Sequence, residues 1–167
     1  MKKHQGFTLV EIAVVIAVIG IIASIAIPQY GAYLKKAKIT QAVMITKEAM
    51  DALVTYHTVN RQFVPNYGDL SRRNREVGLQ NHSQYASDDV RLMWVGSRGV
   101  RGKDSTSAHV AVLLPPDMGF QDEGQSRAHM LSTIEFRDGR YILQCNDKDA
   151  VWPSTIKSEL LHGECDN

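Results

Sequence analysis

The chain has few of the features that mark a catalytic or metal-binding protein. Only two of its 167 residues are cysteines, Cys145 and Cys165, and the absence of CxxC spacing argues against a zinc site. There is no nucleophile elbow, P-loop, HExxH pair or Rossmann fingerprint among its serines, histidines and aspartates. The sequence therefore predicts a protein that is not an enzyme and needs no cofactor or metal.

The chain also lacks a strong overall charge. The formal net charge is +1 at pH 7, so nothing global points to nucleic acid. The charge is nevertheless uneven, with a net of +3 over residues 1–60, +4 over 61–103 and −6 over 104–167. Two interpretations stay open: an ordinary solvated surface, or head-to-tail complementarity between neighbouring copies.

One long apolar run stands out in this background. From Ile12 to Ile27 only Gly20 and Ser24 are not strongly apolar or alanine. Together with residues 7–10 the run reaches about 21 residues, which is enough to cross a hydrocarbon core of about 30 Å. The sequence therefore predicts a membrane-spanning helix near the N-terminus.

A single carboxylate, Glu11, interrupts the start of this run. A charge at the centre of a bilayer costs about 2.5–3.5 kcal/mol on insertion scales, so such a residue usually has a function. Residues 6 to 11 read Gly-Phe-Thr-Leu-Val-Glu and follow the basic leader Met1-Lys2-Lys3-His4-Gln5. This block resembles the cleavage-and-assembly signature of type IV prepilins.

The resemblance continues through Pro28-Gln29-Tyr30 into a charged helical stretch. It returns at the end of the chain, where Gly163-Glu164-Cys165-Asp166-Asn167 is similar to the last residues of Pseudomonas-type major pilins. Residues 61–130 resemble no family that we can name, and this is the region in which pilins differ from one another.

The resemblance assigns a role to each unusual residue of the N-terminal segment. Cleavage by the prepilin peptidase follows Gly6, and Phe7 becomes the N-methylated N-terminus. Glu11 lies one helical turn further on, where it would meet the cationic Phe7 amine of a neighbouring subunit or of its own. A charge pair in a dry core is strong when complete and costly when half-formed, so it would set the register of assembly.

Two further features of the segment follow from the resemblance. Gly20 and Pro28 weaken helices, and Pro28 should kink this one because it lacks an N–H and clashes with the preceding turn. We expect residues 20–28 to loosen when the helix packs into a filament. The resemblance also implies a disulfide between Cys145 and Cys165, worth about 3 kcal/mol in an oxidising compartment.

The expected fold is α+β: a long N-terminal helix packed on a small antiparallel sheet with a C-terminal disulfide loop. Apolar residues at helical spacing predict that the helix packs through Ile39, Ala42, Val43, Ala49, Met50, Leu53 and Tyr56. Strands are predicted at 91–96, 108–114, 130–136 and 140–145, the last two joined by an Asp138-Gly139 turn.

The organisation follows from these elements. The expected parts are a leader (1–6), a transmembrane and assembly helix (7–28), an amphipathic helix (29–58), a variable connecting loop (59–90), the sheet (91–145) and the disulfide-bounded loop (145–165).

The resemblance implies a structural function, as the subunit of a type IV pilus that serves adhesion, twitching motility or DNA uptake. The implied partners are other pilin subunits, the prepilin peptidase and N-methyltransferase, the assembly machinery and the inner membrane, with a host surface or DNA as a further partner. The chain would lie in the inner membrane of a Gram-negative bacterium and then in an extracellular fibre. A minor pilin, a DNA-binding pilin-like competence protein and a type II secretion pseudopilin are the alternatives within the family.

Other interpretations stay open. Ser24-Ile25-Ala26 is a tolerable site for a cleaved secretory signal, although Glu11 would then have no use. A DNA-binding face would use Arg72, Arg73 and Arg75, with further basic residues at Arg61, Arg91, Arg98, Arg101 and Lys103. Asp117, Asp122 and Glu123 offer oxygens to calcium, but without EF-hand spacing.

Overall fold

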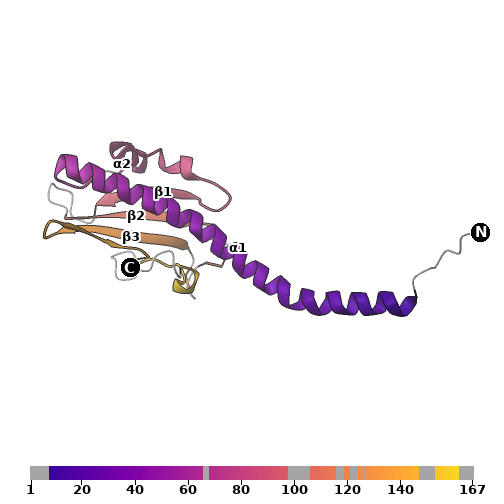
Figure 1. Cartoon of the computed structure of the whole chain (residues 1–167). Coiled ribbons are helices and arrows are strands. Elements are labelled where there is room, and N and C mark those ends of the chain that lie inside the picture. Colours follow the sequence, from indigo (N-terminus) through magenta and orange to yellow (C-terminus); the bar gives the residue numbers. More distant parts are fainter. Residues whose placement is uncertain are drawn as a thin grey trace, which may run out of the picture. The chain divides into compact units, whose positions relative to one another are not determined.

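The structure, a computed structural model, describes residues 8–65, 68–97, 106–115, 119–120, 124–125, 127–146 and 153–161. The chain divides into two compact units, an N-terminal unit (Met1–Lys35) and a head (Lys36–Asn167). Helix α1 (Leu9–Asn60) is 52 residues long and contributes to both. The head adds α2 (Leu70–Glu76), η1 (His82–Tyr85), β1 (Leu92–Ser97), β2 (Ser107–Leu114), β3 (Ala128–Arg137), β4 (Arg140–Gln144) and η3 (Ser158–Leu160) (Figure 1).

The four strands form one antiparallel sheet in the order β1-β2-β3-β4. Each strand pairs with the next along the chain, so the predicted strands are confirmed within two residues at either end. The β3–β4 hairpin closes between Arg137 and Arg140, through Asp138 at φ 51° and Gly139 at φ 75°. Two consecutive residues with positive φ define a type I′ turn, as the Asp-Gly pair predicts.

The head's hydrophobic core lies between one face of this sheet and α1 (Figure 1). The sheet contributes alternate residues, among them Met93, Val95, Val110, Val112, Met130 and Ile134, all with no exposed surface. From α1 the buried residues are Ile39, Ala42, Val43, Thr46, Ala49, Met50, Leu53 and His57. The α+β class is therefore confirmed, with a helix packed on a four-stranded sheet.

The predicted helical stripe packs on the core as expected, but it omits His57. Tyr56 is only partly buried at the margin of the core, and His57 takes the buried position beside it. Leu53 and His57 are four residues apart and therefore share a helix face, and Tyr56, three residues after Leu53, lies beside them.

The segment 59–90 contains more regular structure than the predicted loop. α1 continues to Asn60, and α2 begins where the Asp69 carboxylate accepts hydrogen bonds from the backbone N–H groups of Ser71 and Arg72. The helix ends before Gly78, whose φ of 80° suits glycine. The turn-forming residues thus flank two short helices, α2 and η1. The spacing of glycine, proline and asparagine in the sequence did not predict these helices.

Asn74 of α2 closes the outer edge of β1. Its side chain is fully buried, donates from Nδ2 to the carbonyl of Met93 (3.1 Å) and accepts at Oδ1 from the N–H of Val95 (3.1 Å). The amide thereby replaces a missing neighbouring strand on an edge that would otherwise invite pairing with another chain.

We expect Asn74→Ala to destabilise the head by about 2 kcal/mol or more, because it leaves a buried N–H and a buried carbonyl without partners. Urea unfolding of the full chain in detergent measures this change. Glu76→Ala, on the exposed end of the same helix, is the control and should cost less than about 0.5 kcal/mol. Equal unfolding midpoints for both variants would contradict the role given to Asn74.

His57 is the centre of an aromatic cluster that joins α1 to the β3–β4 hairpin. Its ring lies 4.4 Å from Phe63 and 4.7 Å from Phe136, measured between ring centroids. Its Nδ1 is 2.9 Å from the Tyr141 hydroxyl, which lies 3.0 Å from Thr58 Oγ1. Burial lowers the pKa of His57, and the nearby Arg61 cation lowers it further.

These contacts predict a pH-dependent head. The unfolded chain binds a proton at His57 more readily than the folded protein does, so stability is complete above pH 6.5 and falls as the pH drops below it. Melting temperatures of the full chain in detergent, measured between pH 5 and 8, should show this loss. His57→Gln should flatten the profile below pH 6.5. An unchanged profile in His57→Gln would assign the pH dependence to another group.

Candidate functional site

The N-terminal unit begins its helix with a side-chain cap. Glu11 Oε2 accepts one hydrogen bond from the Thr8 backbone N–H and another from Thr8 Oγ1, both at 2.8 Å. In return Thr8 Oγ1 accepts from the Glu11 N–H at 3.3 Å. This reciprocal pair is a capping box, with Thr8 as the N-cap and Glu11 at the third helical position. The carboxylate that the sequence singles out therefore has a local partner within its own subunit.

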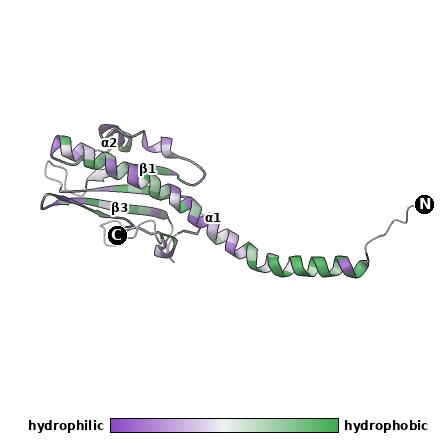
Figure 2. Cartoon of the chain, in the orientation of Figure 1, coloured by the Kyte–Doolittle hydropathy of each residue, from purple (hydrophilic) through white to green (hydrophobic). Residues whose placement is uncertain are grey.

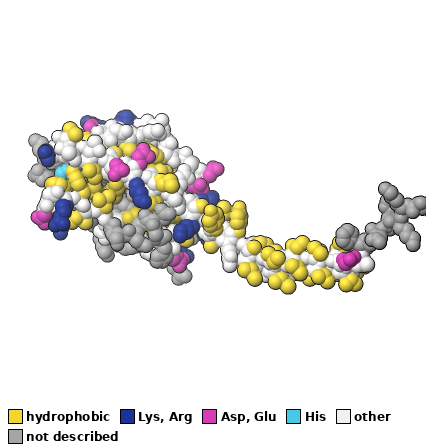
Figure 3. All heavy atoms as spheres, viewed as in Figure 1, with side chains coloured by type: hydrophobic (Ala, Val, Ile, Leu, Met, Phe, Trp, Pro, Cys, Tyr) yellow, Lys and Arg dark blue, Asp and Glu magenta, His cyan; other side chains and the backbone are white. Residues whose placement is uncertain are grey.

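The first half of α1 carries apolar side chains around its whole circumference (Figure 2). From Thr8 to Lys35 every residue is exposed except Ala23, which is partly buried. Figure 3 shows hydrophobic side chains along the same segment and acidic colour near its N-terminal end. The helix is long and apolar enough to cross a membrane. Its stretch from Leu9 to Ile27 spans about 28 Å at 1.5 Å per residue, close to the ~30 Å of a hydrocarbon core.

Ser24 and Pro28 change the hydrogen bonding of this helix in different ways. Ser24 Oγ donates to the carbonyl of Ile21 at 2.7 Å, so its hydroxyl needs no outside partner. Pro28 lies inside the helix and cannot donate to the carbonyl of Ser24, four residues earlier. All residues from Gly20 to Pro28 are helical in the single chain. Loosening of this section in a fibre remains a prediction.

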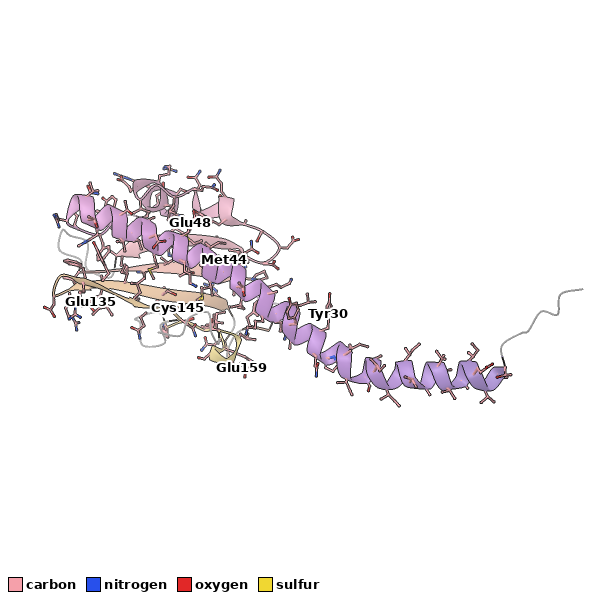
Figure 4. All side chains as sticks on the ribbon, in the orientation of Figure 1. Tyr30, Met44, Glu48, Glu135, Cys145 and Glu159 are labelled. Carbon is pink, nitrogen blue, oxygen red and sulfur yellow. The ribbon has the colours of Figure 1, made fainter. Side chains whose placement is uncertain are left out.

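The aromatic residues that follow the apolar stretch are also exposed. Tyr30 and Tyr33 have 64% and 69% of their surface accessible, and Leu34 has 40%. Met44, in the head, is 64% exposed on α1 (Figure 4). Exposed apolar surface on this scale marks a membrane or protein contact.

The three arginines considered for DNA binding all lie on α2, but in different surroundings. Arg72 is exposed and lies 3.7 Å from Glu76, and the exposed Arg75 donates to Asn81 Oδ1 at 2.7 Å. Arg73 is partly buried, and its Nη1 would lie 3.1 Å from a Cβ added at Gly96 of β1. Burial lowers the pKa of Arg73. The triplet is therefore not one exposed basic face, and DNA binding by it stays a prediction.

The structure describes only some of the remaining predicted site residues. Gly6, Phe7, Cys165, Arg98, Arg101, Lys103, Asp117, Asp122 and Glu123 lie outside the described residues. Within the described ranges no group of three His, Cys, Asp or Glu side chains is placed to hold a metal ion. Cys145 follows β4 (Figure 4) and is not a free thiol. Its pairing with Cys165 remains a prediction.

Part of the predicted disulfide loop is attached to the sheet by hydrogen bonds. Thr155 exchanges backbone and side-chain bonds with His129 of β3, at 3.0 Å in both directions. Ser154 Oγ contacts both the His129 carbonyl and Asn146 Oδ1, and Lys157 N–H donates to the carbonyl of Phe120. Ser154 and Thr155 are thus held against the start of β3, and Lys157 is bonded to Phe120.

We expect Cys165→Ser to lower the free energy of unfolding by about 3 kcal/mol, because the reduced chain gains freedom in the unfolded state. Urea unfolding of the full chain with and without reductant measures the effect, and reductant should reproduce it in the unmodified protein. Ser158→Ala, at an exposed position of the same loop, is the control. A midpoint insensitive to both the substitution and the reductant would mean that this bond is absent.

Comparisons with known proteins agree with this geometry. Residues 1–27 match the family described as the prokaryotic N-terminal methylation motif. The chain is 27% identical over 104 residues to a fimbrial protein of Neisseria meningitidis serogroup B, covering 62% of this chain and 57% of that one. It is 54% identical over 43 residues to a fimbrial protein of Pseudomonas aeruginosa, covering 26% and 28%. It is 30% identical over 80 residues to the type IV major pilin protein PilE of Neisseria gonorrhoeae, covering 48% and 44%.

The resemblance to type IV pilins is confirmed. The alignments cover between about a quarter and somewhat more than half of these relatives' own length. The matched motif covers residues 1–27 and therefore ends before the head begins.

Three residues that shape the structure were not singled out from the sequence. Thr8 precedes Glu11 by three positions, and the Thr-Leu-Val-Glu string is a capping-box pattern that could have been recognised. Asn74 and His57 had no local signal, because their partners are distant in the sequence.

Proposed function

We propose that this chain is the structural subunit of a type IV pilus, anchored in the inner membrane until it is processed and polymerised into a surface fibre. The observation that carries the proposal is the N-terminal unit. It matches the methylation motif, presents an apolar helix with almost no buried residue, and is attached to a head whose core is complete without it.

Such a helix needs two successive environments. Its length suits the membrane first, and in a fibre the same apolar surface would be covered by the helices of neighbouring copies. The prepilin peptidase and N-methyltransferase would act at Gly6 and Phe7, and the assembly machinery would move the mature subunit. The heads and the Cys145–Cys165 loops would form the fibre surface, which could serve adhesion, twitching motility or DNA uptake.

A minor pilin and a secretion pseudopilin share the N-terminal unit. Abundance in fibres separates a major from a minor subunit. A deletion that impairs secretion while leaving piliation intact would indicate a pseudopilin.

The proposal is tested by the intact mass of the protein in material sheared from the cell surface. The expected mass is that of residues 7–167 plus one methyl group, less two hydrogens for the disulfide. A chain that stays in the membrane with its leader attached would contradict assembly. A soluble chain that begins near Ile27 would indicate a secretory signal instead.

Glu11 provides a second test. We expect Glu11→Val to insert and be cleaved, because both need only the apolar run and the leader, but to reach the fibre poorly. The measurement is the ratio of protein in sheared material to protein in membranes. A ratio equal to that of the unmodified chain would remove the charge pair between Glu11 and Phe7 from the account.

A further inference from the structure

We propose that Tyr30, Tyr33 and Lys35 form a binding site on α1 for the headgroups of anionic phospholipids. The inference rests on the membrane stage of the proposed function and names the lipid chemistry that this stage uses. All three residues follow the apolar stretch, belong to the N-terminal unit and are exposed. Figure 4 shows Tyr30 projecting from α1. We call these three residues the interfacial belt.

The interfacial belt lies at the depth of the headgroups when the stretch from Leu9 to Ile27 fills the hydrocarbon core. At about 1.5 Å per residue, Tyr30 lies about 4.5 Å beyond Ile27. By the same rise Tyr33 lies about 9 Å and Lys35 about 12 Å beyond it. The polar layer of a bilayer adds about 5–8 Å on each side of the core. Tyrosine rings favour this layer, and the flexible stem of Lys35 lets its amine reach back to the phosphates.

The charge around the interfacial belt selects an anionic lipid. The sequence has no aspartate or glutamate between Glu11 and Glu48. Lys38 is paired with Asp89 of the head at 2.9 Å, whereas no ion pair within the described part of the chain involves Lys35. The exposed ammonium of Lys35 therefore has no acidic partner in its own chain and is available to a lipid phosphate.

The side of the membrane adds to this argument. Lysines near the ends of membrane helices are usually kept on the cytoplasmic side. In the proposed function the leader with Lys2 and Lys3 faces the cytoplasm, so Lys35 lies on the opposite side, against this bias. Anionic headgroups on that side attract the cation, and together with the tyrosines they fix how deeply the helix sits before assembly.

The probe is phosphatidylglycerol, with zwitterionic phosphatidylcholine as the comparison lipid. Mass spectrometry of the intact full chain in detergent micelles, titrated with each lipid, gives the ratio of the two dissociation constants. We expect the unmodified chain to prefer phosphatidylglycerol by about five-fold or more, the factor that one lysine contributes near anionic lipid. Added salt should reduce this preference, because the charges are exposed.

Substitutions at Lys35 test the charge. Lys35→Gln should lower the preference about five-fold, whereas Lys35→Arg keeps the charge and should stay within about two-fold of the unmodified chain. Lys47→Gln is the matched control, because Lys47 is an exposed lysine of the same helix but belongs to the head. It should also stay within about two-fold. Tyr30→Leu/Tyr33→Leu should weaken the binding of both lipids alike, because tyrosine contributes its ring and hydroxyl without charge.

Equal affinity of the unmodified chain for the two lipids would overturn the proposal. A Lys47→Gln variant as weak as Lys35→Gln would do so too, because any exposed lysine would then suffice. So would a Lys35→Arg variant that loses the preference, or unchanged lipid affinities in Tyr30→Leu/Tyr33→Leu.

The outcome is distinguishable from failure of the proposed function. If the unmodified chain reaches sheared fibres but shows no preference between the lipids, only the lipid site is removed. If the preference is present but the chain never reaches sheared material, the pilus-subunit proposal is wrong and the lipid site stands. If Lys35→Gln keeps the preference but loses fibres, Lys35 contacts another copy of the chain and the lipid site is overturned.

Discussion

The structure depends on the exposed apolar surface of the N-terminal part of α1. The apolar side chains of α1 from Leu9 to Leu34 are exposed in the single chain, and the α1 residues of the head's core begin at Ile39. Exposed apolar surface of this extent is unfavourable in water, so the segment must lie in lipid or against other chains. The hydrophobic effect therefore underlies both parts of the proposed function, membrane insertion and assembly.

The distribution of apolar and charged residues along α1 changes between the N-terminal unit and the head. Up to about Leu34 the helix is apolar on all sides, and from Ile39 it buries a single stripe and turns charged side chains such as Lys47 and Asp51 outwards. The stripe allows the helix to pack on the sheet, while Asn74 closes one edge of that sheet and the His57 cluster fastens the hairpin to the helix. The head is thus held together by contacts of its own.

Features governed by local rules could be predicted from the sequence. The apolar run, the strands and the Asp138-Gly139 turn depend on near neighbours, and their predicted places are confirmed. The burial of His57 was missed, because an apolar stripe is read from apolar residues and its hydrogen-bond partner Tyr141 lies far along the chain. Asn74 was missed because its bonds reach residues 19 and 21 positions away. The spacing of Arg72, Arg73 and Arg75 could not show that one of them lies over the sheet beside Gly96.

The central claim is that the exposed apolar helix becomes the interior of a fibre. A helical reconstruction of fibres sheared from the cell surface tests it most directly. The account predicts that residues 9–34 of each copy lie at the fibre axis, buried against the same residues of other copies, with the four-stranded sheets outside. A fibre with this helix exposed to solvent, or fibres built from another protein while this chain stays in the membrane, would contradict it.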